Sequence, residues 1–364
     1  MVVSEVIKII EGFAPPALAE NFDNVGLMVG DKSMRVRGIL LTLDVVEESV
    51  DEAVERGLNL IITHHPLIFS PLKSLTGKNY IERVLIRAIK QGVAIYSAHT
   101  NLDSVQQGVS FRLGEKLGLQ KMQVLRPVKN NLLKLVVYSP FNYSNGIRKA
   151  LADSGAGFIG QYDSCSFSAM GEGRFRATAG LRPFVGSVGE LHTEKEERIE
   201  TVVQRHKLAE TLVQLRRVHP YEEMAYDVMP LENMDPSVGL GVIGEFSEEM
   251  DVYDFLGGVK KILQIPMIKY SAPVKNRIRR VALCGGAGAS FINDAINSGA
   301  DIYVTGDLKY HDYFVPDGRI TIADIGHFES EQFTLDIFND VLIKKITNFT
   351  VCKTALNCNP INYL

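Results

Sequence analysis

The sequence predicts an α/β protein in which two related halves form one domain, interrupted by a smaller inserted α+β domain of ferredoxin-like type. Strands and helices alternate after residue 37, and the same alternation returns between residues 281 and 323. A segment of different character, 131–234, separates them and is bounded by the turn-rich stretches "RPVKNN" and "PLENMDPSVG". We therefore expect residues 1–130 and 235–364 to form the larger domain and 131–234 the insertion.

The first half begins with an amphipathic helix and continues as a βαβαβ unit. Val3, Val6, Ile7 and Ile10 are apolar at helical spacing, with charged residues between them. The alternating segments that follow have short connections, which favours a parallel sheet. The predicted elements are strand 39–43, helix 47–56, strand 58–63, helix 80–91 and strand 93–98.

The second half repeats this order and indicates an internal duplication. "ERGLNLIITHHPLIF" aligns with "NSGADIYVTGDLKYH", and "VAIYSAHTNLDS" aligns with "ITIADIGHFESE". With a shift of one residue, the second pairing places His99 and Asp103 opposite His327 and Glu331, so polar residues align as well as apolar ones. The predicted elements are strand 281–284, helix 289–298, strand 301–305 and strand 319–323.

The inserted segment has its own strand and helix signals. We expect a small βαβ-type α+β domain placed in a loop of the larger one. Its predicted elements are strand 133–139, helix 144–154, a strand region rich in glycine and serine, a charged helix 197–208 and a strand 225–229.

Composition excludes several classes of function. The formal net charge of -4 gives no general attraction to nucleic acid or anionic lipid. The 4 cysteines form no CxxC pair, which argues against a zinc ribbon and against a disulfide framework. No apolar run has membrane-spanning length, and the N-terminus does not resemble a signal peptide. We expect a cytoplasmic protein that does not bind membranes, and its charge argues against nucleic acid as a partner.

Two adjacent histidines, His64 and His65, follow the predicted strand 58–63 in "IITHHP". Successive side chains of an extended chain point to opposite sides, so the pair suits two different ions rather than one. Further ligands come from the repeat, in which an acid follows a histidine by four residues in each half. If 328–343 is a helix, His327 and Glu331 lie one turn apart on one face, and Glu331 can bridge two cations.

The donors indicate a catalytic rather than a structural metal site. The predicted ligands are His64, His65, Asp103, His327 and Glu331. They give about six bonds to two divalent ions, which leaves positions for water. Mixed imidazole and carboxylate donors suit zinc, iron or manganese. A histidine at a strand end is otherwise most often a surface or hydrogen-bonding residue.

Six blocks in order along both halves of the chain carry a further signal. They are "NFDNVGLMVGD", "ITHHPLIF", "SAHTNLDS", "GADIYVTGDLKYHD", "GHFESE" and "NPINYL". Together they resemble the Nif-three-like dinuclear metal-centre family, whose members are named GTP cyclohydrolase 1 type 2 homologues.

The resemblance implies the same five ligands around two metal ions, with Glu331 as the bridge. It also implies a toroidal homohexamer with the metal sites facing its interior. "VHPYEEMAYDVMPL" is similar to a block of the inserted domain of longer members, which resembles trimeric signalling and copper-tolerance proteins. Cys358 is a small departure from the family pattern that concerns packing.

Other residues were assigned roles from their positions in the repeat. His99 is a candidate catalytic residue, as a proton shuttle or a group that orients Asp103, or else a buried histidine bonded to backbone. Asp307 is a second catalytic candidate because it and His311 lie in the segment of the repeat that matches the histidine pair. Asp23 and Asn24 are pocket residues or an ordinary turn.

Two weaker motifs favour structural interpretations. "CGGAGAS" follows a strand and opens a helix but lacks the last glycine of the dinucleotide fingerprint and a Walker lysine, which favours tight packing. His219, Tyr221, Glu222 and Glu223 of the insertion suit a structural turn better than a ligand site.

Two functions are consistent with these features. The first is a two-metal hydrolase that acts on a nucleotide-like or phosphorylated substrate, with the ring opening of GTP as the reaction that the family name implies. The second is a metal-dependent regulatory or scaffold protein, whose inserted domain senses a ligand while the ions hold a ring of subunits together.

Overall fold

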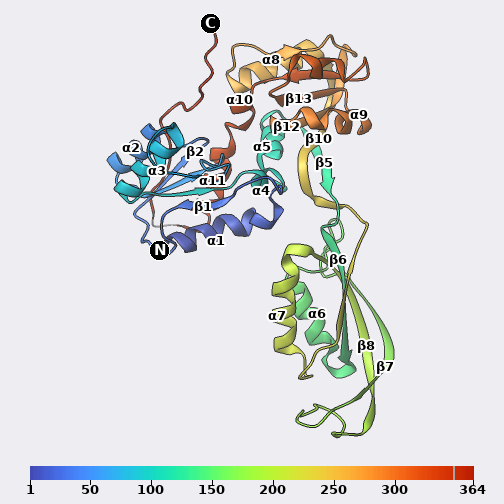
Figure 1. Cartoon of the computed structure of the whole chain (residues 1–364). Coiled ribbons are helices and arrows are strands. Elements are labelled where there is room, and N and C mark those ends of the chain that lie inside the picture. Colours follow the sequence, from blue (N-terminus) through green and yellow to red (C-terminus); the bar gives the residue numbers. More distant parts are fainter. Residues whose placement is uncertain (347–348) are drawn as a thin grey trace. The chain divides into compact units, whose positions relative to one another are not determined.

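The computed structural model describes residues 1–346 and 349–364. The chain divides into two compact units, one formed by Met1–Arg126 with Val238–Leu364 and the other by Pro127–Ser237 (Figure 1). The larger unit contains two β-sheets, and the smaller unit contains one.

The first sheet of the larger unit is mostly parallel and has the strand order β1-β4-β3-β2-β15. Strands β2, β3 and β4 are parallel neighbours, as the βαβαβ pattern predicted. Strand β15 pairs in parallel with β2, while β1 pairs with β4 in the antiparallel sense. The strands are β1 (Gly26–Val29), β2 (Ile39–Thr42), β3 (Leu60–Thr63), β4 (Ala94–Ser97) and β15 (Val351–Lys353).

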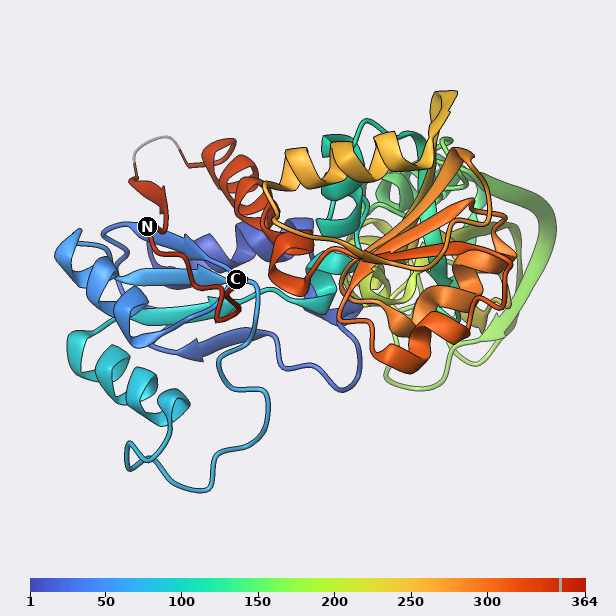
Figure 2. The ribbon, with the colours of Figure 1, turned by 90° about the horizontal axis from the view of Figure 1, so that it is seen from above.

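Helices cover both faces of this sheet, which explains why its central strands are apolar on both sides. Leu60 and Ile62 of β3 face the helices α1 (Val3–Phe13) and α11 (Thr334–Ile343). Ile61 faces the helices α2 (Glu47–Glu55) and α3 (Tyr80–Gln91). Figure 2 shows α11 and α3 on opposite sides of the sheet.

The second sheet repeats this plan with the order β11-β14-β13-β12-β10-β5. Its strands β12, β13 and β14 are parallel in the same spatial order as β2, β3 and β4, and antiparallel β11 takes the place of β1. Equivalent strands in an equivalent order are what the sequence repeat predicted. The strands are β5 (Gln120–Val128), β10 (Asp235–Asp251), β11 (Lys269–Tyr270), β12 (Arg277–Ala287), β13 (Ile302–Gly306) and β14 (Thr321–Asp324).

The second sheet also lies between helices. Helices α5 (Val109–Lys116) and α8 (Val252–Leu263) pack on one face through Phe111 and Phe255, and α9 (Ile292–Asn297) packs on the other. Two very short helices follow strands in the two halves, α4 (Thr100–Asp103) after β4 and α10 (His327–Glu331) after β14. Single 3-10 turns complete the unit: η1 (Pro16–Leu18), η4 (Ala289–Phe291) and η5 (Tyr310–Phe314).

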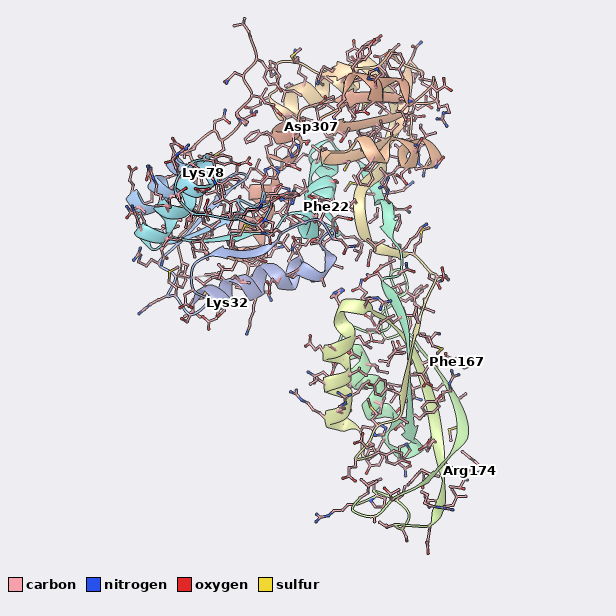
Figure 3. The ribbon with its side chains drawn as sticks, viewed as in Figure 1. Phe22, Lys32, Lys78, Phe167, Arg174 and Asp307 are labelled. Atoms are coloured by element: carbon pink, nitrogen blue, oxygen red, sulfur yellow. The ribbon has the colours of Figure 1, made fainter. Side chains whose placement is uncertain are left out.

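The smaller unit has an antiparallel sheet of order β7-β8-β6-β9 with two helices. Leu135, Ile147, Ile199 and Leu215 belong to its own core, which joins strands to helices. Phe167 and Arg174 lie on the long strand β7 (Figure 3). The elements in chain order are β6 (Leu132–Pro140), η2 (Phe141–Tyr143), α6 (Ser144–Asp153), β7 (Ser166–Arg176), β8 (Leu191–Gln204), η3 (Arg205–Lys207), α7 (Leu208–Val218) and β9 (Tyr226–Pro230).

Two helix predictions were wrong. Residues 197–208 were expected to be a helix, but strand β8 runs to Gln204 and α7 begins only at Leu208. The side chains of Ile199, Thr201 and Val203 are buried at a spacing of two, which suits a strand, while the charged residues suggested a helix. The expected single helix 328–343 is interrupted, because α10 ends at Glu331 and α11 begins at Thr334.

None of the helices in the described part of the chain is long and apolar enough to cross a membrane.

Candidate metal centre

The candidate site forms where the carboxyl ends of parallel strands from both sheets meet. His64 and His65 follow β3, and Asp103 ends the short helix α4 after β4. From the second half, His327 and Glu331 are the first and last residues of α10 after β14. In open α/β sheets ligands bind beyond the carboxyl ends of the strands, so both halves present side chains at the expected edge.

The five predicted ligands lie together. His65 Nε2 is 2.9 Å from Glu331 Oε2 and 3.2 Å from His327 Nε2. His327 Nε2 is 3.3 Å from the same Glu331 oxygen. The ligand atoms of these three residues are among those that could hold a metal ion.

The other Glu331 oxygen faces the first histidine. His64 Nε2 is 3.7 Å from Glu331 Oε1 and 3.7 Å from Asp103 Oδ1. His64 and Glu331 are almost fully buried, at 0% and 3% exposure, and Asp103 is 19% exposed. The two oxygens of one carboxylate therefore face two different groups of donors.

Each of the three ligand histidines is held by its Nδ1 atom. His65 Nδ1 is 2.8 Å from Asp44 Oδ1, and His64 Nδ1 is 3.0 Å from the carbonyl oxygen of Ala98. His327 Nδ1 is 2.7 Å from Asp307 Oδ2. Because a carbonyl and an ionised carboxylate only accept, each Nδ1 carries the proton and each Nε2 faces the centre.

One buried nitrogen at the centre, His64 Nε2, has no hydrogen-bond partner. A buried lone pair without a partner costs free energy, and such an atom in a native structure requires an explanation. Divalent metal ions accept both imidazole nitrogen and carboxylate oxygen as ligands. The residues present therefore fit a metal centre.

The pKa shifts show how strongly the charges at the centre interact. Burial lowers the pKa of His65, but hydrogen bonds with Asp44 and Glu331 outweigh it and raise the pKa to about 10. Burial also lowers the pKa of His327, while Glu331 and Asp307 raise it to about 9. Without a cation, these imidazoles therefore hold protons that balance the carboxylates.

The pKa values of the remaining predicted ligands shift in the directions that their surroundings require. Burial lowers the pKa of His64. Burial and the nearby Glu331 carboxylate raise the pKa of Asp103 well above its usual value. Burial acts to raise the pKa of Glu331 too, but the surrounding histidines, His64 first, lower it well below its usual value. Glu331 is thus the ionised carboxylate at the centre.

His99 lies beside the histidine pair. Its ring centroid is 5.1 Å from that of His64 and 5.5 Å from that of His65. Its Nδ1 is 2.9 Å from Asp23 Oδ1, so a carboxylate and not a backbone carbonyl orients the ring. Burial would raise the pKa of Asp23, but hydrogen bonds from His99 and Thr100 lower it below its usual value.

Asp307, the other catalytic candidate, contacts His327 and follows β13 (Figure 3). Its backbone has a φ of 55°, in the left-handed region. His311 is exposed, and its ring packs 5.2 Å from that of Tyr310. Asn24 donates to the carbonyl oxygen of Ile68, which is a contact between loops. Catalytic roles for His99 and Asp307 stay predictions.

Sequence reasoning missed Asp44. It follows β2 as His65 follows β3, so it could have been found by asking which polar residues end each neighbouring parallel strand. Its hydrogen bond to His65 gives it the role that Asp307 has for His327.

Gly286 of "CGGAGAS" makes room for the carboxylate of Glu331. A Cβ atom at Gly286 would lie 2.3 Å from Glu331 Oε1, and the φ of Gly286 is 66°. The backbone N–H of Gly286 donates to Ser330 Oγ at 2.8 Å. This loop packs against α10, as the packing interpretation of the motif predicted.

The Duf34/NIF3 (NGG1p interacting factor 3) family matches residues 1–360. The chain belongs to the NIF3 family.

Relatives within this family are similar over nearly the whole chain. A GTP cyclohydrolase 1 type 2 homolog of Halalkalibacterium halodurans is 39% identical over 88% of this chain and 87% of its own. One of Bacillus subtilis is 36% identical over 94% of this chain and 91% of its own. The crystal structure of a Bacillus cereus protein related to NIF3 has a TM-score of 0.87 and 37% identity, covering 100% of this chain and 99% of that one.

Proposed function

We propose that this NIF3-family protein is a hydrolase that uses two divalent metal ions and acts on a small nucleotide-like or phosphorylated substrate. The observation that carries the proposal is the arrangement of His64, His65 and His327, with Asp103, around the two oxygens of Glu331. Three protein donors per ion leave coordination positions free for water and substrate. Zinc, iron and manganese all suit these donors.

Two divalent ions at this place would supply Lewis acidity, lowering the pKa of a water and stabilising negative charge on a substrate oxygen. The residues of the chain would do the rest. Asp44 and Asp307 keep the Nε2 atoms of His65 and His327 directed at the centre.

His99 is the residue that we assign to proton transfer. Its Nδ1 is fixed by Asp23, which directs Nε2 away from that carboxylate, and its ring lies beside His64 and His65. Its ligand atom lies within 4.8 Å of theirs, which is close enough to exchange a proton with a group bound at the centre through one water.

The test is turnover by metal-loaded protein. A panel of nucleotides and phosphoesters should be screened with iron, manganese and zinc in turn under reducing conditions. We expect hydrolysis of some member, lost in His65→Ala and Glu331→Gln but retained in His311→Ala, which removes an exposed histidine outside the centre. The absence of turnover with every metal would contradict the proposal.

A metal-dependent regulatory or scaffold protein is the second candidate function. The compact smaller unit, with its own core, favours it. Its order β6-α6-β7-β8-α7-β9 is that of the ferredoxin-like plan, and we propose that it is an inserted ligand-sensing domain. The block around His219 is held internally, since His219 donates to Tyr138 and Tyr221 donates to Glu196.

Self-association separates the two functions. We propose that the chain forms a toroidal homohexamer in the cytoplasm. Size-exclusion chromatography with light scattering should be run before and after chelation. A hexamer that survives chelation, together with metal-dependent turnover, supports the hydrolase; a ring that dissociates on chelation, without turnover, supports the scaffold.

A further inference from the structure

We propose that Phe22 and Phe69 bind the planar base of a nucleotide whose phosphate is held at the candidate metal centre. Metal ions are taken to hold the phosphate, so the proposal rests on the proposed function in that respect. The two rings are the part of the site that separates nucleotides from phosphoesters without a base.

The two rings are apolar surface that the fold leaves uncovered. Phe22 is 66% exposed and Phe69 is 49% exposed, and their ring centroids are 6.3 Å apart. Burial of an aromatic side chain stabilises a fold, and two adjacent exposed rings forgo that stabilisation. Adjacent apolar side chains on a surface can mark a ligand-binding or interaction site.

Hydrogen bonds attach the loop of Phe22 to the candidate metal centre. The carboxylate of Asp23, the next residue, accepts from the backbone N–H of Thr100 at 3.0 Å and from its hydroxyl. The other oxygen of Asp23 is 2.9 Å from His99 Nδ1, and the ring of His99 lies beside that of His65. Phe22 is therefore the chain neighbour of the residue that orients His99.

Phe69 lies on the loop that follows the histidine pair, four residues after His65. The side-chain amide of Asn24 donates to the carbonyl oxygen of Ile68, which ties this loop to the loop of Phe22. Each ring is thus only a few residues along the chain from a group at the centre, and a hydrogen bond holds the two loops together.

The spacing of the rings suits a planar ligand. Carbon atoms in contact are about 3.5 Å apart, so a flat ring between two parallel rings needs their centroids about 7 Å apart. The two phenylalanine rings are 6.3 Å apart with their planes at 45°, so they must separate by about 1 Å and turn parallel. Exposed side chains change rotamer within nanoseconds, so a ligand meets no large barrier to this movement.

A planar ring joined to an anion is the chemistry that this pair of features recognises. Bases stack on aromatic side chains through their π faces, and such stacking tolerates different bases. Divalent ions at the centre stabilise negative charge on phosphoryl oxygens. A nucleotide offers both parts in one molecule, whereas ribose phosphate offers only the anion.

A tryptophan reporter tests the proposal, because the chain contains no tryptophan. Zinc-loaded, full-length Phe22→Trp and Phe69→Trp proteins should be titrated with adenosine monophosphate, guanosine monophosphate and ribose phosphate. We expect both nucleotides to quench the indole fluorescence, because the base stacks against the indole, and to protect it from quenching by acrylamide. Ribose phosphate should change neither signal.

Tyr253→Trp is the matched control. Tyr253 is 56% exposed, and its ring centroid is also 6.3 Å from that of a second exposed aromatic residue, Tyr270. It lies at the N-terminal end of α8, while Gln332, next to α10, donates to Leu263 at the other end, about 15 Å away along the helix. Neither nucleotide should change the fluorescence of this variant.

Removal of each ring measures its contribution to nucleotide affinity. Phe22→Ala and Phe69→Ala should each weaken binding of adenosine monophosphate to zinc-loaded protein by about 5-fold or more in calorimetry, which is the usual effect of losing one stacked aromatic side chain. The affinities for ribose phosphate and for zinc should stay the same, because neither ring contacts the phosphate or an ion.

Equal binding of nucleotides and ribose phosphate would overturn the inference, and so would an equal response of Tyr253→Trp. A Phe22→Trp protein whose indole is shielded from acrylamide before nucleotide is added would also overturn it, since another protein surface then covers the rings. Circular dichroism checks folding, and Phe69→Trp gives an independent reading if Phe22→Trp does not fold.

The same panel separates this inference from the proposed hydrolase. Nucleotide binding to the two rings without turnover of any substrate would refute the hydrolase and leave the inference standing. Metal-dependent turnover that is equal for nucleotides and ribose phosphate, and unchanged in Phe22→Ala and Phe69→Ala, would support the hydrolase and overturn the inference.

Discussion

Binding of a metal ion by His65, His327 and Glu331 should release protons. In the metal-free protein His65 and His327 have pKa values raised to about 10 and about 9. Both imidazoles are therefore almost fully protonated at pH 7, although their Nε2 atoms are the expected metal ligands. A metal ion can bind only after both Nε2 protons have left.

The number of protons released, and the pH dependence of metal affinity, follow from these two pKa values. About two protons should be released at pH 7 for each ion that His65 and His327 bind, because both pKa values lie two or more units above that pH. The apparent association constant should then rise by about 100-fold per pH unit between pH 6 and 8, and the rise should become shallower as the pH approaches 9.

Calorimetry measures the number of released protons directly. Zinc titrations at pH 7 in buffers of different ionisation enthalpy give the protons released per ion. Release of fewer than about one proton, with an affinity independent of pH, would refute the assignment of protonated imidazoles. In His327→Ala the number should fall by about one, because one titrating ligand is gone.

The same pKa values set the alkaline stability of the metal-free protein. A histidine whose pKa rises from 6.5 on folding contributes stability that is complete below about pH 6.5 and is lost as the pH passes its folded pKa. The melting temperature in a chelator should therefore fall from pH 7 to pH 10. The melting temperature of zinc-loaded protein should fall less, because the ion replaces the protons.

Three further perturbations test parts of the structure. Gly286→Ala should abolish metal binding measured by calorimetry, because the added Cβ would lie 2.3 Å from Glu331 Oε1; unchanged binding would contradict this packing. Ile61→Ala should lower the free energy of unfolding by about 2 to 5 kcal/mol in a urea titration, because the side chain is fully buried, and a loss under 1 kcal/mol would be inconsistent with that burial. Asn359→Ala removes a 2.9 Å hydrogen bond to Glu329, which lies between two ligands in α10, so zinc affinity should fall several-fold; equal affinity would show that the C-terminal tail does not position this helix.

The sequence predicted the parts of the fold that depend on local pattern. Apolar runs such as 58–63 end at turn signals, and three such runs in each half gave the parallel strands. The helix predicted over 197–208 failed because charge was weighed above the alternation of Ile199 and Val203. In that stretch burial against α6 and α7 selects the strand over the helix that the charged residues suggested.

The site was predictable to the extent that its residues follow strands. Histidines and acids at strand ends identify the expected ligands. The sequence repeat adds His327 and Glu331 of the second half to those of the first. Asp44 was missed because nothing in its neighbourhood resembles a motif, and only the adjacency of β2 and β3 brings it to His65. The two carboxylate oxygens of Glu331 face different groups of donors. This too could not be predicted, because it depends on the position of α10, which tertiary packing fixes.

The repeat explains why the described residues form one candidate metal centre and not one in each half. In the repeat His64 corresponds to Gly306, and His65 corresponds to Asp307. A Cβ atom at Gly306 would lie 2.9 Å from the backbone oxygens of both Gly286 and Gly326, so no histidine fits there. The strand end of the second half therefore supplies Asp307 to hold His327, and the first half supplies the pair of imidazoles. Equivalent positions of the repeat therefore hold a predicted ligand, His65, in one half and its counterpart Asp307, which orients His327, in the other.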